Sequence, residues 1–216
     1  DYSEIASYYR PGHADYGFDA KYGFRDYRGG GRSSGRETIG RVAAGAIAAK
    51  ILKEMGITFL TYTQSIGDFA VDPARFDAAE ISNNPLYMPD ADCAKEAQEY
   101  LDRCLEQKNS SGGTIECIAY GLPAGIGDPV FEKLDANLAK AMFSIGAVKG
   151  FEIGDGFAVS KATGLTNNDA FCLAKDGSIS KETNHSGGTL GGMSDGSPLL
   201  MRVAISDWCA SRIVVP

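Results

Sequence analysis

The clearest structural signal in the sequence is Ser34-Gly-Arg-Glu-Thr-Ile-Gly-Arg-Val-Ala-Ala-Gly-Ala-Ile-Ala-Ala-Lys-Ile-Leu-Lys-Glu-Met-Gly56. A serine followed three positions later by a glutamate, here Ser34 and Glu37, is the capping box that begins many helices. Apolar residues then recur every three or four positions until Gly56, and a glycine is typical at the end of a helix. The spacing predicts one long amphipathic helix from about residue 35 to residue 55, with the apolar positions Ile39, Val42, Ala43, Ala46, Ile47 and Leu52.

Basic residues and glycines gather just before this helix. Six of the ten arginines lie between Arg10 and Arg41, and three consecutive glycines, Gly29–Gly31, precede Arg32. Residues 1–50 hold eight Lys or Arg against six Asp or Glu, although the whole chain has a net charge of −7. Backbone amides, hydroxyls and the dipole at a helix N-terminus bind phosphate and carboxylate groups, and arginines strengthen such sites. The pattern favours a small-anion site; the alternative is a capped surface helix whose arginines are only solvated.

The rest of the chain alternates unevenly between helical and extended patterns. Asp176-Gly177 between alternating residues is the strongest hairpin signal. Residues 1–34 are expected to be loop and short extended pieces, and Gly187–Gly196 a Gly-rich loop. These features favour an α+β fold with mixed or antiparallel sheets over a doubly wound parallel sheet. The predicted helices are 72–81, 91–108 and 129–145 (the last with Val130, Leu138, Ala141 and Met142 on its buried side), and the predicted strands are 57–66, 114–120, 148–153 and 199–205, with a hairpin over 171–180.

Length and composition limit the class of protein. The chain has 216 residues, of which 44% are hydrophobic, so it can bury the core of a single domain. Its longest apolar run, Val42–Ala49, is too short to span a bilayer, and no secretory segment heads the chain. Five cysteines without a CxxC pair favour free thiols in a reducing compartment. The acidic balance argues against a nucleic-acid partner, and a first residue other than Met suggests an upstream segment.

Two histidines, His13 and His185, are the only ones in the sequence. Imidazole titrates near neutral pH and suits proton transfer, but a lone histidine is more often a hydrogen-bonded structural residue. The two lack metal-ligand spacing, so no metal site is expected. A GxGxxG motif after a strand, a P-loop and a GxSxG elbow are also missing, which leaves Rossmann, P-loop and serine-hydrolase functions unsupported.

Several longer motifs together resemble the chorismate synthase family. They occur in the family's order from about residue 1 to residue 204, which makes the match far more specific than one glycine motif. The resemblance implies an α+β fold with helices sandwiched between sheets. The motifs are Arg10–Asp15, Gly31–Thr38, Arg41–Ile47, Gly121–Phe131, Lys133–Ala136, Ser144–Gly150, Glu152–Phe157 and Asn184–Gly192.

The resemblance also implies an activity. Chorismate synthases convert 5-enolpyruvylshikimate 3-phosphate to chorismate by 1,4-elimination of phosphate, in the shikimate pathway of aromatic amino-acid biosynthesis. The reaction requires reduced FMN without a net redox change. The resemblance associates the protein with FMN and NADP, the cytoplasm and a homotetramer, and leaves open how reduced FMN is supplied.

Roles for individual residues follow from the matching motifs. His13 matches the histidine that acts as an acid toward the reduced flavin. Arg10 and Arg36 match residues that bind the substrate's phosphate and carboxylates. His185 is expected to shape the flavin pocket, and Asp155 is a weaker candidate because an Asp between glycines is often a turn residue. The residues expected to bind FMN are Arg32, Ser33, Ser34, Gly146, Ala147 and Gly191.

Two motifs of the family have no counterpart in the chain. They are an upstream Gly-Glu-Ser-His-Gly-like motif with a second catalytic histidine and a downstream Arg-His-Asp-Pro-like motif with a catalytic aspartate. After Ala204 the family's Lys-Pro-Thr-like segment is replaced by Ile205–Pro216, a divergent, frame-shifted or misassigned tail. We therefore expect residues 1–216 to be a single, incomplete chorismate synthase domain; the alternative is an FMN- or anion-binding fragment without catalysis.

Overall fold

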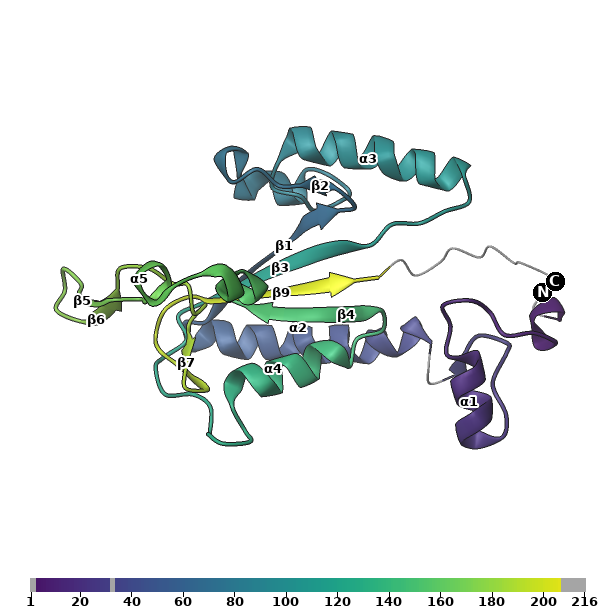
Figure 1. Ribbon diagram of the computed structural model, residues 1–216, viewed down its shortest axis with the longest axis horizontal. Coiled ribbons are helices and arrows are strands. Elements are labelled where there is room, and N and C mark those ends of the chain that lie inside the picture. Colours follow the sequence, from purple (N-terminus) through teal and green to yellow (C-terminus); the bar gives the residue numbers. More distant parts are fainter. Residues whose placement is uncertain (1–2, 32–33, 207–216) are drawn as a thin grey trace.

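Antiparallel strands form the centre of the protein in the computed structural model, which describes residues 3–31 and 34–206. Within this part, one sheet has the strand order β2-β1-β3-β9-β4, and the pairs β5-β6 and β7-β8 form two small hairpins (Figure 1). The predicted α+β class with antiparallel sheets is confirmed. The strands are β1 Thr58–Ile66, β2 Phe69–Ala70, β3 Gly113–Tyr120, β4 Val148–Ile153, β5 Phe171–Leu173, β6 Ile179–Lys181, β7 Thr189–Leu190, β8 Met193–Ser194 and β9 Leu199–Ile205.

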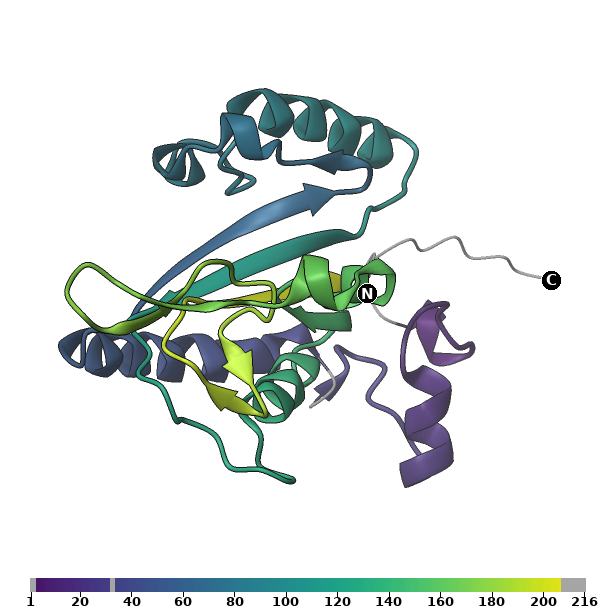
Figure 2. The ribbon, with the colours of Figure 1, turned by 60° about the vertical axis from the view of Figure 1, so that its left-hand side comes forward.

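Helices cover both faces of the large sheet unequally. Helices α2 and α4 lie along one face, whereas α3 lies on the opposite side beside β2 (Figures 1 and 2). The N-terminal helix α1 lies beyond the end of the sheet at which β4 begins. The α-helices are α1 Asp15–Tyr22, α2 Thr38–Glu54, α3 Ala91–Glu106, α4 Leu134–Phe143 and α5 Gly164–Asn167, and the 3-10 helices are Glu4–Ala6, Gly35–Glu37, Pro73–Arg75, Ala78–Ser82 and Gly156–Lys161.

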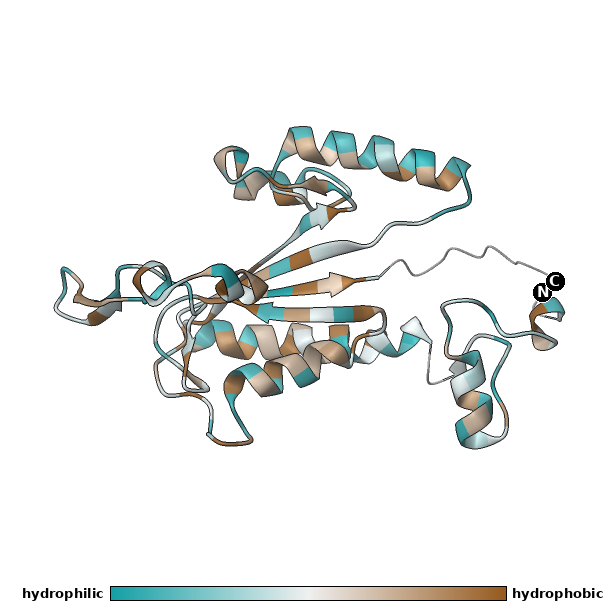
Figure 3. Cartoon of the chain, in the orientation of Figure 1, coloured by the Kyte–Doolittle hydropathy of each residue, from teal (hydrophilic) through white to brown (hydrophobic). Residues whose placement is uncertain are grey.

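The long helix predicted from residue 35 is confirmed. Ser34 is its N-cap, and its hydroxyl oxygen accepts a hydrogen bond from the backbone N–H of Arg36. A short 3-10 turn then continues into α2. The apolar positions of α2 are nevertheless exposed, with Ile39 at 76% and Val42 at 67% of their full accessibility. The family resemblance implies helices between two sheets. Among the described residues, a large sheet lies against only one face of the layer formed by α2 and α4 (Figure 3).

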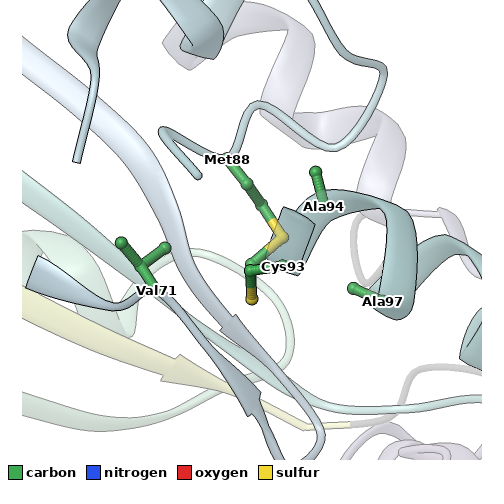
Figure 4. Packing of buried hydrophobic residues seen from close by; sticks show 5 residues of the cluster. All are labelled: Val71, Met88, Cys93, Ala94 and Ala97. Atoms are coloured by element: carbon green, nitrogen blue, oxygen red, sulfur yellow. The ribbon is translucent and has the colours of Figure 1, made fainter. Parts of the chain in front are cut away.

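Two buried clusters stabilise the fold. One lies between α3 and β2, where Met88 and Ala97 are fully buried and pack with Val71, Cys93 and Ala94 (Figure 4). The other joins β3 and β9 to α4, through Ala119, Leu199, Met201, Leu138 and Met142. The cysteines of the described part, Cys93, Cys104, Cys117 and Cys172, are free thiols as expected; Cys209 lies outside it.

Two predicted helices are partly wrong. The segment 72–81 forms two 3-10 turns, because Asp72 caps the first and Asp77 caps a second one after the chain becomes extended at Phe76. The helix predicted over 129–145 begins only at Leu134, after residues that bridge Asp128 to Glu132. Val130 and Ala141 are therefore exposed, and the buried side is formed by Leu138 and Met142.

Two loop predictions also need correction. Residues 1–34 contain α1, which has a glycine at Gly17 and little apolar periodicity. The Gly-rich loop 187–196 contains the hairpin β7-β8, whose two-residue turn places Gly191 and Gly192 at φ values of 61° and 89°. Two consecutive positive φ values are the signature of a type I′ turn, which glycine adopts without strain. None of the helices over residues 3–31 and 34–206 has the length and hydrophobicity needed to cross a membrane.

Candidate active site

A cavity of about 390 Å³ opens where the N-terminal segment meets the loop between α4 and β4. It brings together six predicted site residues from three separate parts of the chain: Arg10, His13, Ser34, Arg36, Gly146 and Ala147. Its volume is in the usual range for small-molecule sites. We call it the basic cavity, and its lining consists of Arg10, Gly12, His13, Ala14, Asp15, Gly29, Gly30, Ser34, Gly35, Arg36, Gly146, Ala147, Lys149 and Ser206.

A buried carboxylate holds Arg10 in place. Asp15, which is 6% exposed, accepts hydrogen bonds from Nε and Nη2 of Arg10 at 2.9 and 2.8 Å and from its backbone N–H at 2.9 Å. Arg25 adds an ion pair to the same carboxylate at 2.8 Å. The bonds from Arg10 lower the pKa of Asp15 to about 2, so the carboxylate is charged at neutral pH. Asp15 therefore fixes the direction of Arg10 and offsets part of its charge.

The loop carrying His13 fixes which ring nitrogen holds the first proton. Nδ1 of His13 lies 2.9 Å from the carbonyl oxygen of Pro11. A carbonyl can only accept, so Nδ1 carries a hydrogen, and Nε2 is the ring nitrogen that this contact leaves for another partner. Gly12, at φ 70°, gives the turn its left-handed backbone. The geometry thus suits a histidine that acts through Nε2.

Arg36 enters the cavity because a glycine faces it. Its Nη2 lies 3.4 Å from the carbonyl oxygen of Gly29. A Cβ added to Gly29 would sit 2.4 Å from the same nitrogen, and the φ of 133° at Gly29 also disfavours a side chain. The predicted grouping of a Gly-rich turn, Ser34 and Arg36 at the beginning of a helix is confirmed as local geometry. Arg32 and Ser33 lie outside the described residues.

The loop after α4 is tied to helix α2. Arg41 donates hydrogen bonds from Nη2 to the carbonyl oxygen of Ser144 at 2.7 Å and from Nε to its hydroxyl at 3.2 Å. These bonds hold Gly146 and Ala147 beside the N-terminal part of α2. Ala147 has a φ of 67°, and its carbonyl accepts a hydrogen bond from the backbone N–H of Ser206 at 2.9 Å. A small side chain is the least obstructive one in this strained position at the cavity wall.

Three other candidate residues lie away from the basic cavity. Gly191 is in the β7-β8 turn, and His185 is in the loop before β7. Nδ1 of His185 lies 2.7 Å from a carboxylate oxygen of Asp155. The lining of the basic cavity includes none of the three. Their roles at the flavin stay predictions.

A buried ion cluster fixes the loop that carries His185. Asp169 accepts hydrogen bonds from the backbone N–H groups of His185 and Ser186 at 2.8 and 2.9 Å. The ammonium of Lys181 pairs with Asp169 and Asp195 at 3.2 and 2.7 Å. Hydrogen bonds from Ser186 and other neighbours outweigh the effect of burial and lower the pKa of Asp169. These contacts fix the backbone of the loop, so the buried charges of this cluster have a structural role.

Sequence reasoning assigned no role to three polar residues that line the basic cavity: Asp15, Lys149 and Ser206. Asp15 belongs to the motif that contains Arg10 and His13, so its acidic side chain between basic ones was a usable signal. Lys149 belongs to the motif Ser144–Gly150, so it too carried a usable signal, whereas Ser206 comes directly after a strand and reads as an ordinary surface position. Their place depends on how β4 and β9 pair, which the local pattern does not reveal.

The fold and cavity define an α+β protein with a cavity lined by basic side chains at one end of an antiparallel sheet. Residues 1–210 match the sequence profile of chorismate synthase. The chain belongs to the chorismate synthase family.

Individual relatives support this assignment. The chain is 74% identical over 205 residues to a chorismate synthase of Agathobacter rectalis and 64% identical to one of Lachnoclostridium phytofermentans; each match covers 95% of this chain and 56% of the relative. A crystal structure of a chorismate synthase superposes with a TM-score of 0.82 at 32% identity, over 90% of this chain and 63% of that structure. The chain thus spans about 56% of the length of these curated relatives.

Proposed function

We propose that the protein catalyses, or forms part of an enzyme that catalyses, the conversion of 5-enolpyruvylshikimate 3-phosphate to chorismate and phosphate. The observation that carries this proposal is the basic cavity, in which Arg10, His13 and Arg36 meet Gly146 and Ala147. Arg36 and Gly146 are 110 positions apart in the sequence and belong to separate motifs, and the fold brings both to this cavity. The names of the relatives support the same activity.

The substrate's charges match the side chains of the cavity. It carries one phosphate and two carboxylates, and planar guanidinium groups hold such anions through paired hydrogen bonds. Arg36 is proposed to bind one of these groups, and Arg10, which Asp15 holds in place, another. Asp15 keeps Arg10 from rotating away when the substrate is absent.

The proposed cofactor is reduced FMN. Glycines, a helix N-terminus and cationic side chains form the donor set of the cavity, and such a set fits a phosphorylated flavin. When bound, reduced FMN supplies electron density transiently for the elimination. Ser34, Gly146 and Ala147 are proposed to hold it from the described part of the chain, and Arg32, Ser33 and Gly191 are proposed to add contacts.

His13 is proposed to act as the acid of the site. The carbonyl oxygen of Pro11 accepts the hydrogen on Nδ1 and fixes the orientation of the ring. The second proton is then held at Nε2, where it can be given to a neighbouring basic atom. His13 would thereby supply general acid catalysis.

The protein's context is also a proposal. We infer that residues 1–216 form a single domain that is incomplete relative to the family, because they span 56% of the curated relatives and leave the apolar side of α2 exposed. Further segments or subunits would cover that side. A homotetramer in the cytoplasm follows from the family resemblance alone. The second candidate function, an FMN- or anion-binding fragment without catalysis, is less favoured, because the similar relatives are named chorismate synthases.

Flavin binding tests the proposed function most directly. We expect the protein to bind oxidised FMN and to bind it more tightly when 5-enolpyruvylshikimate 3-phosphate is present, because both ligands share the basic cavity. A titration that follows flavin fluorescence measures both affinities. Unchanged fluorescence at high protein concentration would remove the cofactor assignment.

Replacement of Arg36 by lysine separates ligand binding from folding. Arg36→Lys is expected to raise KM for the substrate about tenfold or more, since lysine keeps the charge but loses the planar fork. The melting temperature should stay within about 2 °C, because the hydrogen bond of the Arg36 guanidinium within residues 3–31 and 34–206 is a long one to Gly29 on an exposed surface. Steady-state kinetics and thermal unfolding of the active enzyme measure the two effects. The matched control is Arg103→Lys, at an exposed position on α3. An unaltered KM in Arg36→Lys would show that Arg36 is only a solvated helix residue.

A further inference from the structure

Lys149 is a cation in the basic cavity to which no role has been assigned. It differs from Arg10, whose guanidinium already binds the carboxylate of Asp15 through two nitrogens. Over residues 3–31 and 34–206, no acidic side chain pairs with the ammonium group of Lys149. Its charge is therefore available to a ligand in the cavity.

The backbone places Lys149 at an irregular point of the sheet. In the pairing of β4 with β9, Val148 lies opposite Ile205 and Gly150 lies opposite Ala204, so Lys149 is the extra residue of a β-bulge. A bulge turns a side chain away from the regular alternation of a strand and is often found beside an active site. Here it places an exposed lysine in the wall of the cavity.

The chain directly before the bulge is held firmly. Val148 is 6% exposed and belongs to the buried interior. The backbone N–H of Ser206 donates to the carbonyl of Ala147, directly before it, at 2.9 Å. Because its neighbours are fixed, the root of the Lys149 side chain stays at the cavity while its four-carbon stem can adjust to a ligand.

The chemistry of lysine indicates the kind of group that it binds. A compact, flexible ammonium is a common point-charge partner of phosphate, whereas guanidinium forks suit planar carboxylates. We propose that Lys149 binds a phosphate monoester in the basic cavity. This inference rests on the proposed function, which supplies two such groups: the phosphate of FMN and that of the substrate.

Matched variants distinguish the two sources. Lys149→Met, Lys149→Arg and the control Lys140→Met, an exposed lysine on α4 outside the cavity, are compared in binding titrations with FMN, riboflavin and 5-enolpyruvylshikimate 3-phosphate. We expect Lys149→Met to weaken one phosphorylated ligand at least tenfold, Lys149→Arg to restore most of the affinity, and Lys140→Met to change nothing. Weaker FMN with unchanged riboflavin assigns the flavin phosphate; weaker substrate with unchanged FMN assigns the substrate phosphate.

A chemical measurement tests Lys149 separately from the enzyme's activity. Acetic anhydride labels exposed lysines, and mass spectrometry of the peptide that contains Lys149 reports its protection. We expect inorganic phosphate to protect Lys149 and leave Lys140 reactive, even if the protein bound neither FMN nor substrate and the proposed function failed. Equal labelling with and without phosphate, FMN or substrate would overturn the inference, as would an unchanged affinity of Lys149→Met for both phosphorylated ligands while the wild type binds them.

Discussion

His13→Ala is expected to lower kcat at least tenfold in the active enzyme while FMN binding remains measurable. The physical reason is the loss of the proton at Nε2, since general acid groups contribute about 10²–10⁴-fold to a rate. The flavin contacts proposed for Ser34, Gly146 and Ala147 are not touched by the change. Anaerobic assays that read chorismate by absorbance give kcat, and flavin fluorescence gives the affinity for FMN.

A second variant separates the proton from the structure of the loop. In His13→Asn, a side-chain amide can still donate to the carbonyl of Pro11, but it carries no titratable proton. We expect the same loss of kcat and the loss of the limb of the pH profile that depends on the acid form of residue 13. Full activity of His13→Asn with an unchanged pH profile would show that His13 only shapes its loop.

The 216-residue chain by itself is expected to form no detectable chorismate with reduced FMN. It spans 56% of its curated relatives, and the family resemblance implies a second catalytic histidine and a catalytic aspartate in motifs that these residues do not match. Each missing acid–base group costs about 10²–10⁴-fold, so two together would abolish a measurable rate. The assay is the same anaerobic measurement, with a full-length relative as the positive control.

The same sample should associate or dissolve poorly. Exposed Ile39, Val42, Ile47 and Ile51 lie along α2, and a continuous apolar surface of this kind drives association. Sedimentation at several concentrations measures the effect. Robust turnover by this chain would contradict the expectation and indicate a shorter catalytic machinery around His13 and Arg36.

Elements with strong local signals could be predicted from the sequence. Helix α2, strands β1, β3, β4 and β9, and the hairpin at Asp176-Gly177 were found because their periodicity and turn residues agree with the final fold. Helix α1 was missed because long-range bonds stabilise it. Arg25 pairs with Asp15 in its first turn and donates to the carbonyls of Ile5 and Tyr8. Tertiary contacts of this kind override weak local propensity.

The residues of the site could be predicted from their motifs, but the long-range contacts that hold them in place could not. The residues Arg10, His13, Ser34 and Arg36 belong to motifs that carry their own signal, so the cavity could be expected near the beginning of α2. The contacts that arrange them join distant parts of the chain, as in the bonds from Arg41 to Ser144. The bulge at Lys149 likewise exists only because β4 pairs with β9, about 50 residues later. The spacing of residues within one segment does not indicate which distant segments pair with it.

The position of β9 in the sheet also affects how the protein can fold during synthesis. Strand β9 lies between β3 and β4, yet it is the last of the three to leave the ribosome, about 80 residues after β3 ends. At about 5–20 residues per second, the edge of β3 stays unpaired for roughly 4–16 s. During that interval β4 has no partner strand in the sheet, and the loop beside it cannot take its final place. The basic cavity is therefore among the last parts of the nascent chain to form.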